Sequence, residues 1–204
     1  MYQGVWVRVP TSTGGFVSLT KWHSQTLARF RQLDDAILEA CQAMLKSAHP
    51  GLKGLQLPRA DFACEPKGLQ IHMGYGHISL SCGLLGSPFV VDTLNSPSPE
   101  HQSVMKKQLK AIYRRRGGLD IPVIRVQAQT NVECGVRCVA YAVELAIGSV
   151  KSLDDLSKLN FAPQKKLYEH LISCLELPVP ELSPFPKGEG RLVLTNPQPA
   201  MYKI

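Results

Sequence analysis

Hydrophobic and polar residues repeat with different periods along the chain, and each period predicts a type of element. Alternation in the segment GVWVRV, residues 4–9, predicts a short strand. Residues 68–82 and 87–95 are rich in apolar and β-branched residues and flank the turn-like GLLG, so we expect two neighbouring strands. The segment IPVIRV, residues 121–126, predicts a further strand.

Four other segments show helical spacing. The first begins at Leu33 and ends before His49-Pro50-Gly51, which cannot continue a helix. The segment 96–118 opens with serine and proline and closes with arginines and glycine, as helix ends favour. Two more helices are expected after residue 134 and over residues 164–177. Helices and strands in mixed order, with short turns, predict an α+β fold.

The last part of the chain differs in composition. Residues 178–204 carry six prolines, at positions 178, 180, 184, 186, 197 and 199. Proline-rich segments favour extended, weakly packed chain. We therefore expect a folded domain over residues 1–177 and a loosely packed, proline-rich C-terminal arm over residues 178–204.

Composition and charge narrow the setting. The chain of 204 residues is 44% hydrophobic and 19% charged, which is typical of a globular domain. A net charge of +7 allows a nucleic-acid partner through a basic surface. We expect no secretory signal and no membrane span, because no apolar run approaches the necessary length. The six cysteines are then expected to be reduced, in the nucleus or cytoplasm or in a virion.

The segment VQAQTNVECGVRCVAYAVELAIG, residues 126–148, carries the candidate chemistry. It places a thiol, Cys134, at the start of a predicted helix and two glutamines shortly before it. Unpaired N–H groups and the macrodipole at a helix start favour the thiolate, which is the nucleophilic form. Gly135 would allow a substrate backbone to approach. A preceding amide could donate to an oxyanion, which is worth about 3 kcal/mol in the barrier.

A thiol nucleophile needs a base, and His77 is the candidate. His77 opens one predicted strand and Asp92 closes the next, so the two side chains are expected to meet if the strands pair as a hairpin. Asp92 would then orient the imidazole. His72, five residues earlier, is the alternative base but fits the start of a strand less well.

These residues resemble the site of the ubiquitin-like-protein proteases. That papain-like clan includes the SUMO-specific proteases and the adenovirus maturation protease (adenain-like enzymes). The matching positions are His77, Asp92, and QTNVECG from Gln129 to Gly135 with Cys134. Residues 30–186 are covered, and flanking segments are similar to protease-like domains of mobile elements and large DNA viruses of animals. A viral or mobile-element source is therefore expected.

The resemblance implies a fold, an activity and a set of roles. The fold would be that of a papain-like cysteine protease, with a central mixed or antiparallel sheet flanked by helices. Cys134 would be the nucleophile, His77 the general base and acid, and Asp92 its orienter. The oxyanion hole would use Gln129, on the Q-x-N match, or Gln127, at the adenovirus-type spacing. No metal and no cofactor would be needed.

The implied substrate is a protein. The enzyme would be an endopeptidase or isopeptidase that cleaves after Gly-Gly-type sequences in ubiquitin-like modifiers or viral structural proteins such as a capsid precursor. A narrow channel beside Gly135 would admit glycine next to the cleaved bond. Ile78 stands where many relatives have tryptophan, so the wall of that channel is expected to differ.

Two other interpretations remain open at this stage. One is a structural zinc site, because pairs at i, i+4 spacing on two predicted helices supply four ligands: Cys134, Cys138, His170 and Cys174. The other is a catalytically inactive protease-like module that binds a ubiquitin-like or capsid partner without cutting it.

Overall fold

A computed structural model describes residues 4–57, 62–94, 97–114, 118–127, 132–189 and 200–204. In chain order, the elements of these residues are β1 (Val5–Pro10), β2 (Phe16–Thr20), α1 (Lys21–Ala28), α2 (Asp35–Ala48), β3 (Leu69–Gly74), β4 (His77–Cys82), β5 (Phe89–Asp92), α3 (Pro99–Ile112), β6 (Asp120–Arg125), α4 (Cys134–Ala146), α5 (Leu153–Lys158), α6 (Gln164–Leu175) and β7 (Ala200–Lys203). The prediction of an α+β fold is confirmed.

A mixed sheet of five strands is the centre of the molecule. Its order is β3-β4-β5-β6-β7, and only the pairing of β5 with β6 is parallel. The helix α3 makes the connection that this parallel pairing requires. The strands β1 and β2 form a separate antiparallel pair at the N-terminal end.

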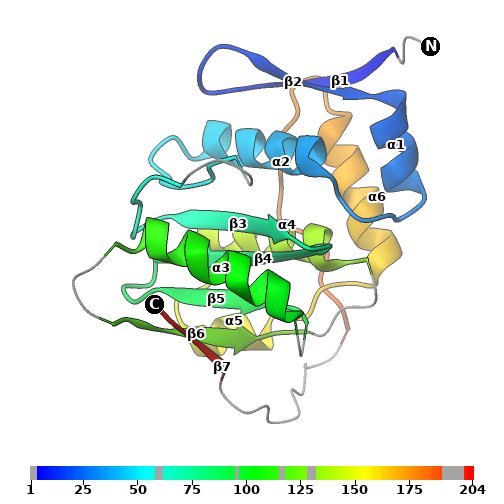
Figure 1. Ribbon diagram of the computed structural model, residues 1–204. Coiled ribbons are helices and arrows are strands. Elements are labelled where there is room, and N and C mark those ends of the chain that lie inside the picture. Colours follow the sequence, from blue (N-terminus) through cyan, green and yellow to red (C-terminus); the bar gives the residue numbers. More distant parts are fainter. Residues whose placement is uncertain (1–3, 58–61, 95–96, 115–117, 128–131, 190–199) are drawn as a thin grey trace.

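Helices cover both faces of the sheet (Figure 1). The helix α3 lies on one face, over a small apolar cluster that includes Val90, Met105 and Leu109. The helix α4 lies on the other face and is covered in turn by α2 and α6, and the larger core fills this side. The helix α4, which begins at Cys134, is therefore packed between the sheet and an outer layer of helices.

The two faces of β3 and β4 differ in chemistry. Apolar side chains, such as Ile71, Ile78 and Leu80, belong to the core that packs on α4. The alternate positions face α3 and are polar but buried: Gln70, His72, His77, Ser79 and Ser81. Because side chains alternate across a strand, a period of two in the sequence produces this division.

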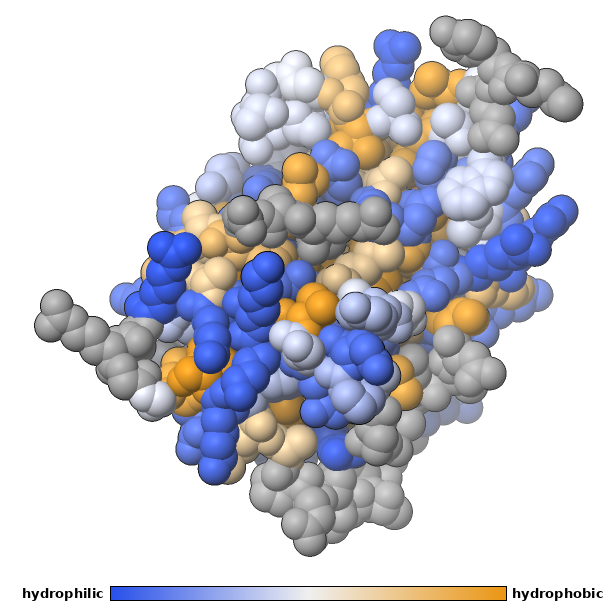
Figure 2. Space-filling view, in the orientation of Figure 1, coloured by the Kyte–Doolittle hydropathy of each residue, from blue (hydrophilic) through white to orange (hydrophobic). Residues whose placement is uncertain are grey.

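Helix ends follow the capping rules where the sequence supplies a cap. Asp34 accepts from the N–H of Ile37 at the start of α2, and Ser98 accepts from His101 at the start of α3. Figure 2 views the molecule from the side of α3, where extended hydrophilic side chains cover the surface. Lys106, Lys107 and Lys110 are exposed on that helix. No helix of the described residues is long and apolar enough to cross a membrane.

The C-terminal segment differs from its prediction. Ala200–Lys203 forms β7 and pairs with β6, and Tyr202 belongs to the cluster under α3. Leu182 and Phe185 are buried in the larger core. The expectation of a loosely packed arm is therefore wrong for these residues, because apolar side chains between the prolines find partners in the domain. The small elements β2 and α5 were also not predicted, since neither has a long periodic pattern.

Candidate active site

The register of the sheet brings His77 and Asp92 together. His77 is the first residue of β4 and Asp92 the last residue of β5, and these strands are antiparallel. Leu80 pairs with Val91, so Ser79 lies opposite Asp92 and His77 lies one diagonal step away on the same face. The expected meeting of these two side chains at the end of the hairpin is what the structure shows.

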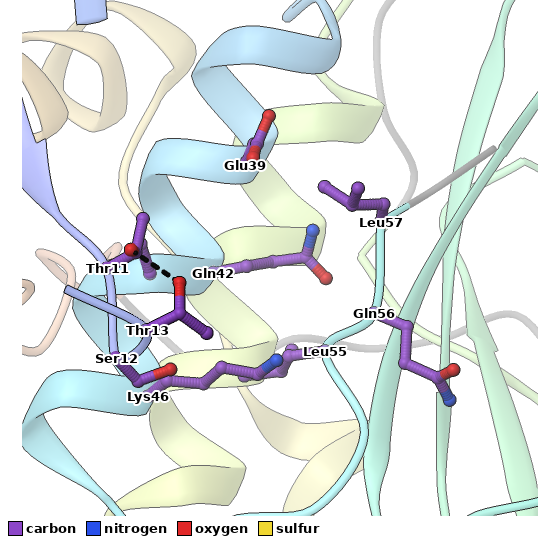
Figure 3. A pocket seen from close by; sticks show the side chains of 10 residues that line it. Thr11, Ser12, Thr13, Glu39, Gln42, Lys46, Leu55, Gln56 and Leu57 are labelled. Atoms are coloured by element: carbon purple, nitrogen blue, oxygen red, sulfur yellow. Dashed lines mark hydrogen bonds between the residues drawn. The ribbon is translucent and has the colours of Figure 1, made fainter. Parts of the chain in front are cut away.

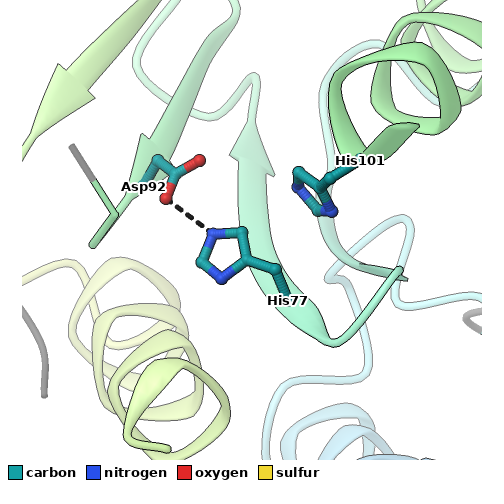
Figure 4. A group of neighbouring side chains, drawn as sticks. All are labelled: His77, Asp92 and His101. Carbon is teal, nitrogen blue, oxygen red and sulfur yellow. Dashed lines mark hydrogen bonds and ion pairs between the residues drawn. The ribbon is translucent and has the colours of Figure 1, made fainter. Parts of the chain in front are cut away.

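The contact between them is short and buried. His77 Nε2 donates to Asp92 Oδ1 across 2.8 Å, and the two side chains are 5% and 1% exposed (Figure 4). The same carboxylate oxygen accepts from the N–H of Leu94 at 2.8 Å. Asp92 is thus fixed by its own backbone turn, and it fixes the imidazole in turn.

Cys134 completes the group. It is the first residue of α4, which packs on the opposite face of the sheet, and it is buried. Burial alone would lower the pKa of His77, but the hydrogen bond to Asp92 and the adjacent Cys134 thiol outweigh that effect and raise it to about 9. The imidazole is therefore protonated at neutral pH, with Nε2 on the carboxylate and Nδ1 left for the thiol.

The helix start that carries Cys134 rests on a buried polar network. Arg137 Nε donates to Glu133 across 2.6 Å, and both side chains are 5% exposed. Another nitrogen of Arg137 donates to Gln127 Oε1, also at 2.6 Å. The hydroxyl of Tyr168 lies 3.1 Å from the carbonyl oxygen of Val132. Sequence reasoning missed this network, although Glu133 and Arg137 have the i, i+4 spacing of a helical ion pair.

Gly135 is needed for packing. A Cβ at this position would lie 2.9 Å from Leu33 Cγ and 3.1 Å from Ile78 Cδ1. Glycine therefore lets α4 approach the sheet and the segment before α2 closely. Ile78 is fully buried beneath this contact. Its side chain faces the core, so the expectation that Ile78 forms a wall of a substrate channel is corrected. The close packing around Gly135 explains why this position needs glycine.

Of the two candidate oxyanion donors, Gln127 and Gln129, the structure describes one. Gln129 lies outside the described residues. Gln127 is described, and its side chain is engaged with the backbone of Phe161: Oε1 accepts from the N–H at 2.9 Å, and Nε2 donates to the carbonyl at 3.2 Å. Gln127 thus ties the chain before α4 to the segment before α6.

The zinc interpretation is not supported. The four residues Cys134, Cys138, His170 and Cys174 do not form a cluster: Cys138 Sγ donates to the carbonyl of Ile78, while Cys174 lies 3.5 Å from His170. The alternative base His72 is also excluded by its environment. Its two ring nitrogens are bonded to Gln108 and Ser81, and burial lowers its pKa to about 4.

Two hollows lie elsewhere on the described surface. One of about 280 Å³ is lined by Asp92, Arg125 and Tyr202, behind the carboxylate. Another of about 250 Å³ lies between the β1–β2 turn, α2 and residues 55–57, and Gln42 extends into it (Figure 3). None of the three residues His77, Asp92 and Cys134 lines the second hollow, so it is separate from the group described above.

The fold is similar to that of solved SUMO proteases. One is the C-terminal Ulp1 protease domain in complex with Smt3, the yeast ortholog of SUMO: 15% identity, 81% of this chain and 86% of that chain covered, TM-score 0.53. A de-sumoylating protease gives 13% identity, 76% and 77% coverage, and a TM-score of 0.53. No protein-family model and no curated protein matches the chain. The chain therefore has the fold of the Ulp1 type of SUMO protease, a papain-like cysteine peptidase fold.

Proposed function

We propose that the protein is a cysteine peptidase of the type that removes ubiquitin-like modifiers. The observation that carries this proposal is the imidazole of His77, held by the Asp92 carboxylate on one side with the Cys134 thiol beside it. A positioned imidazole beside a thiol is the arrangement that activates a cysteine as a nucleophile. The likeness to SUMO protease domains supports the same assignment at the level of the fold.

The reaction would proceed in two halves. The Cys134 thiolate attacks the carbonyl carbon after glycine, and the negative charge moves to the carbonyl oxygen. The backbone N–H of Cys134 and the Gln129 amide would stabilise that oxyanion. As the C–N bond breaks, the amine takes the proton from His77 and a thioester remains. Water then gives a proton to His77 and attacks the thioester, which releases the carboxylic acid and the Cys134 thiolate and restores the ion pair. The carboxylic acid loses its proton to solvent or to the released amine.

Gln129 is the better candidate for the oxyanion donor. Gln127 is already bonded to Phe161 and Arg137, so its amide serves the packing of α4. The proposed substrate is a protein that ends in Gly-Gly at the cleaved bond, either a ubiquitin-like modifier or a viral structural precursor. Smt3, the partner of the solved Ulp1 domain, is the first modifier to test.

The experiment compares matched substrates and matched variants. Modifiers that carry a fluorogenic amine after Gly-Gly, their Ala-Ala counterparts and capsid-derived peptides are incubated with the wild type, Cys134→Ala and Cys138→Ala. We expect the wild type to cleave the Gly-Gly substrates far faster than the Ala-Ala ones. Cys134→Ala should be inactive, whereas Cys138→Ala, one helical turn further on, should keep most of the activity because Cys138 is buried in the core and donates to the Ile78 carbonyl.

A modifier with an electrophile at its C-terminus supplies a second readout. It should label Cys134 in the wild type and nothing in Cys134→Ala. If the electrophile leaves Cys134 unlabelled although the modifier binds, the protein is an inert protease-like module. If Cys134→Ala cleaves at the wild-type rate, the nucleophile is misassigned.

A further inference from the structure

A second histidine packs against the imidazole of the candidate site. His101 lies in the first turn of α3 and is 1% exposed. Its ring centroid is 4.6 Å from that of His77, with the planes at 67° (Figure 4). Figure 4 shows the two rings approaching from different elements, with Asp92 on the far side of His77.

His101 also binds the hairpin that carries His77. Its Nδ1 lies 2.9 Å from the carbonyl oxygen of Gly74, the last residue of β3. Its Nε2 lies 3.1 Å from Ser79 Oγ in β4. His77 falls between these two residues in the chain, so His101 holds the hairpin on both sides of it.

The packing of α3 leaves little room for this contact to shift. A Cβ at Gly74 would lie 3.1 Å from Val104 Cγ1, so the helix rests directly on the backbone of the hairpin. Tyr75 and Gly76, with φ of 48° and 72°, then turn the chain into His77. Positive φ at both turn residues is the geometry of a tight hairpin, so the position of His77 follows that of Gly74.

We propose that His101 is a positioning residue for the reaction. It would hold the His77 imidazole in the orientation and position that let the ring contact both Asp92 and Cys134. The inference rests on the proposed function, since it concerns the same thiol. A misplacement of about 1 Å in a reacting group can cost about a hundredfold in rate, so a side chain that fixes the imidazole need not touch the substrate.

The hydrogen bonds assign the protonation of His101. A carbonyl oxygen can only accept, so Nδ1 carries a proton toward Gly74. In the neutral ring Nε2 is then an acceptor, and it lies 3.1 Å from the hydroxyl of Ser79, which also lies 3.3 Å from Met105 Sδ. A second proton would place a cation beside the His77 imidazolium. Burial and the neighbouring His77 both lower the pKa of His101. His72 also lies near it, and the hydrogen bond to the Gly74 carbonyl and the charge of Asp92 oppose this effect.

A metal ion offers another interpretation of these residues, because nitrogen and oxygen atoms of His77, Asp92 and His101 lie within 4.8 Å of one another. Metal binding would need free lone pairs on both rings. His101 Nε2 is within hydrogen-bond distance of Ser79 Oγ, and His77 Nε2 donates to Asp92. The contacts therefore favour positioning, and zinc titration separates the two interpretations.

The test compares His101→Phe, His101→Asn and His72→Phe with the wild type. Phenylalanine keeps a ring of similar size and removes both hydrogen bonds, whereas asparagine restores a donor at the place of Nδ1. His72 is the matched control: it is equally buried and also joins α3 to β4, through Gln108 and Ser81. Urea unfolding measures how much stability each variant loses.

Two kinetic readouts are used. The first is the rate at which iodoacetamide alkylates Cys134 between pH 5 and pH 8, with alkylation of the exposed Cys64 as the internal reference. The second is the split between kcat and KM on the Gly-Gly substrate. We expect His101→Phe to lower both the alkylation rate and kcat by about tenfold with little change in KM. His101→Asn should recover much of the loss, and His72→Phe should change neither rate.

The outcomes are distinguishable. If alkylation of Cys134 in the wild type rises with pH in the same way as alkylation of the exposed Cys64, the ion pair is absent and the proposed function fails. If Cys134 reacts fast but His101→Phe and His72→Phe behave alike, only the positioning role is overturned. Stoichiometric zinc that requires His101 would also overturn it, in favour of a metal site.

Discussion

His77 takes its protonation state from two neighbours that act in the same direction. Its burial favours the neutral ring, yet the Asp92 carboxylate and the Cys134 thiol raise its pKa to about 9. Hydrolysis by the proposed route needs this proton, because the leaving amine takes it. The proposed route therefore predicts that activity is lost at high pH when His77 loses its proton. Changing Asp92, which raises the pKa of His77 most, should shift this loss to another pH.

Asp92→Asn should shift this alkaline limit of activity. Removing the carboxylate charge lowers the pKa of His77, so activity should fall at a lower pH than in the wild type, and kcat should also drop because the imidazole is less well oriented. The loss should be milder than in His77→Ala, which removes the proton carrier. The measurement is kcat between pH 6 and pH 10, with Asp120→Asn, an exposed residue of β6, as control. An unmoved alkaline limit would refute the coupling.

The start of the helix α4 is held in place by several buried contacts. The residues around its first residue, Cys134, fix its position: Gly135 avoids a clash with Leu33 and Ile78, and the Glu133–Arg137 pair binds Gln127. A buried ion pair of this kind is useful mainly where its geometry is needed, since its desolvation offsets much of its attraction. The ion pair at the helix start therefore serves mainly to fix the position of Cys134.

Gln127 and Gln129 should fail in different ways. Gln127→Ala frees the backbone of Phe161 and leaves Arg137 underbonded, which should cost about 1–3 kcal/mol of stability. Gln129→Ala should lower kcat by about a hundredfold while stability stays near that of the wild type. Urea unfolding and steady-state kinetics on both variants separate the effects. A large kcat loss confined to Gln127→Ala would favour the adenovirus-type alignment.

Elements with strong periodicity could be predicted from the sequence, and those made by tertiary contacts could not. A strand start at His77, a strand end at Asp92 and a helix start at Cys134 were predicted, whereas the division of residues 68–82 into β3 and β4 was not. The strand β7 was missed because a four-residue strand after several prolines has no local signal. His101 was missed for a related reason: nothing near it in the sequence indicates which ring it will contact.

Across the whole molecule, the C-terminal strand closes the sheet. The strand β7 covers the edge of β6, and Tyr202 points into the cluster under α3 while Met201 faces solvent. Tyr202 also lines the hollow behind Asp92. The end of the chain thus supports the face of the sheet on which His77, Asp92 and His101 lie.

Tyr202→Ala should therefore destabilise the protein by about 2–3 kcal/mol, as expected for a largely buried aromatic ring. Met201→Ala, one residue earlier and 51% exposed, should stay within about 0.5 kcal/mol of the wild type. Urea unfolding of the two variants gives the comparison. Equal effects would mean that β7 does not pack as described.

Polar and apolar side chains alternate along β4, and this alternation disfavours incorrect strand register during folding. A slip of β4 by one residue would turn its serines and His77 toward the apolar layer under α4, and Ile78 and Leu80 toward the polar partners on α3. Such a mispairing would bury hydroxyl and imidazole groups without hydrogen-bond partners on the α4 side. On the α3 side it would place apolar side chains against polar groups. The polar side chains on one face of β4 thus disfavour a shifted strand pairing, and the native register is the one that places His77 beside Asp92.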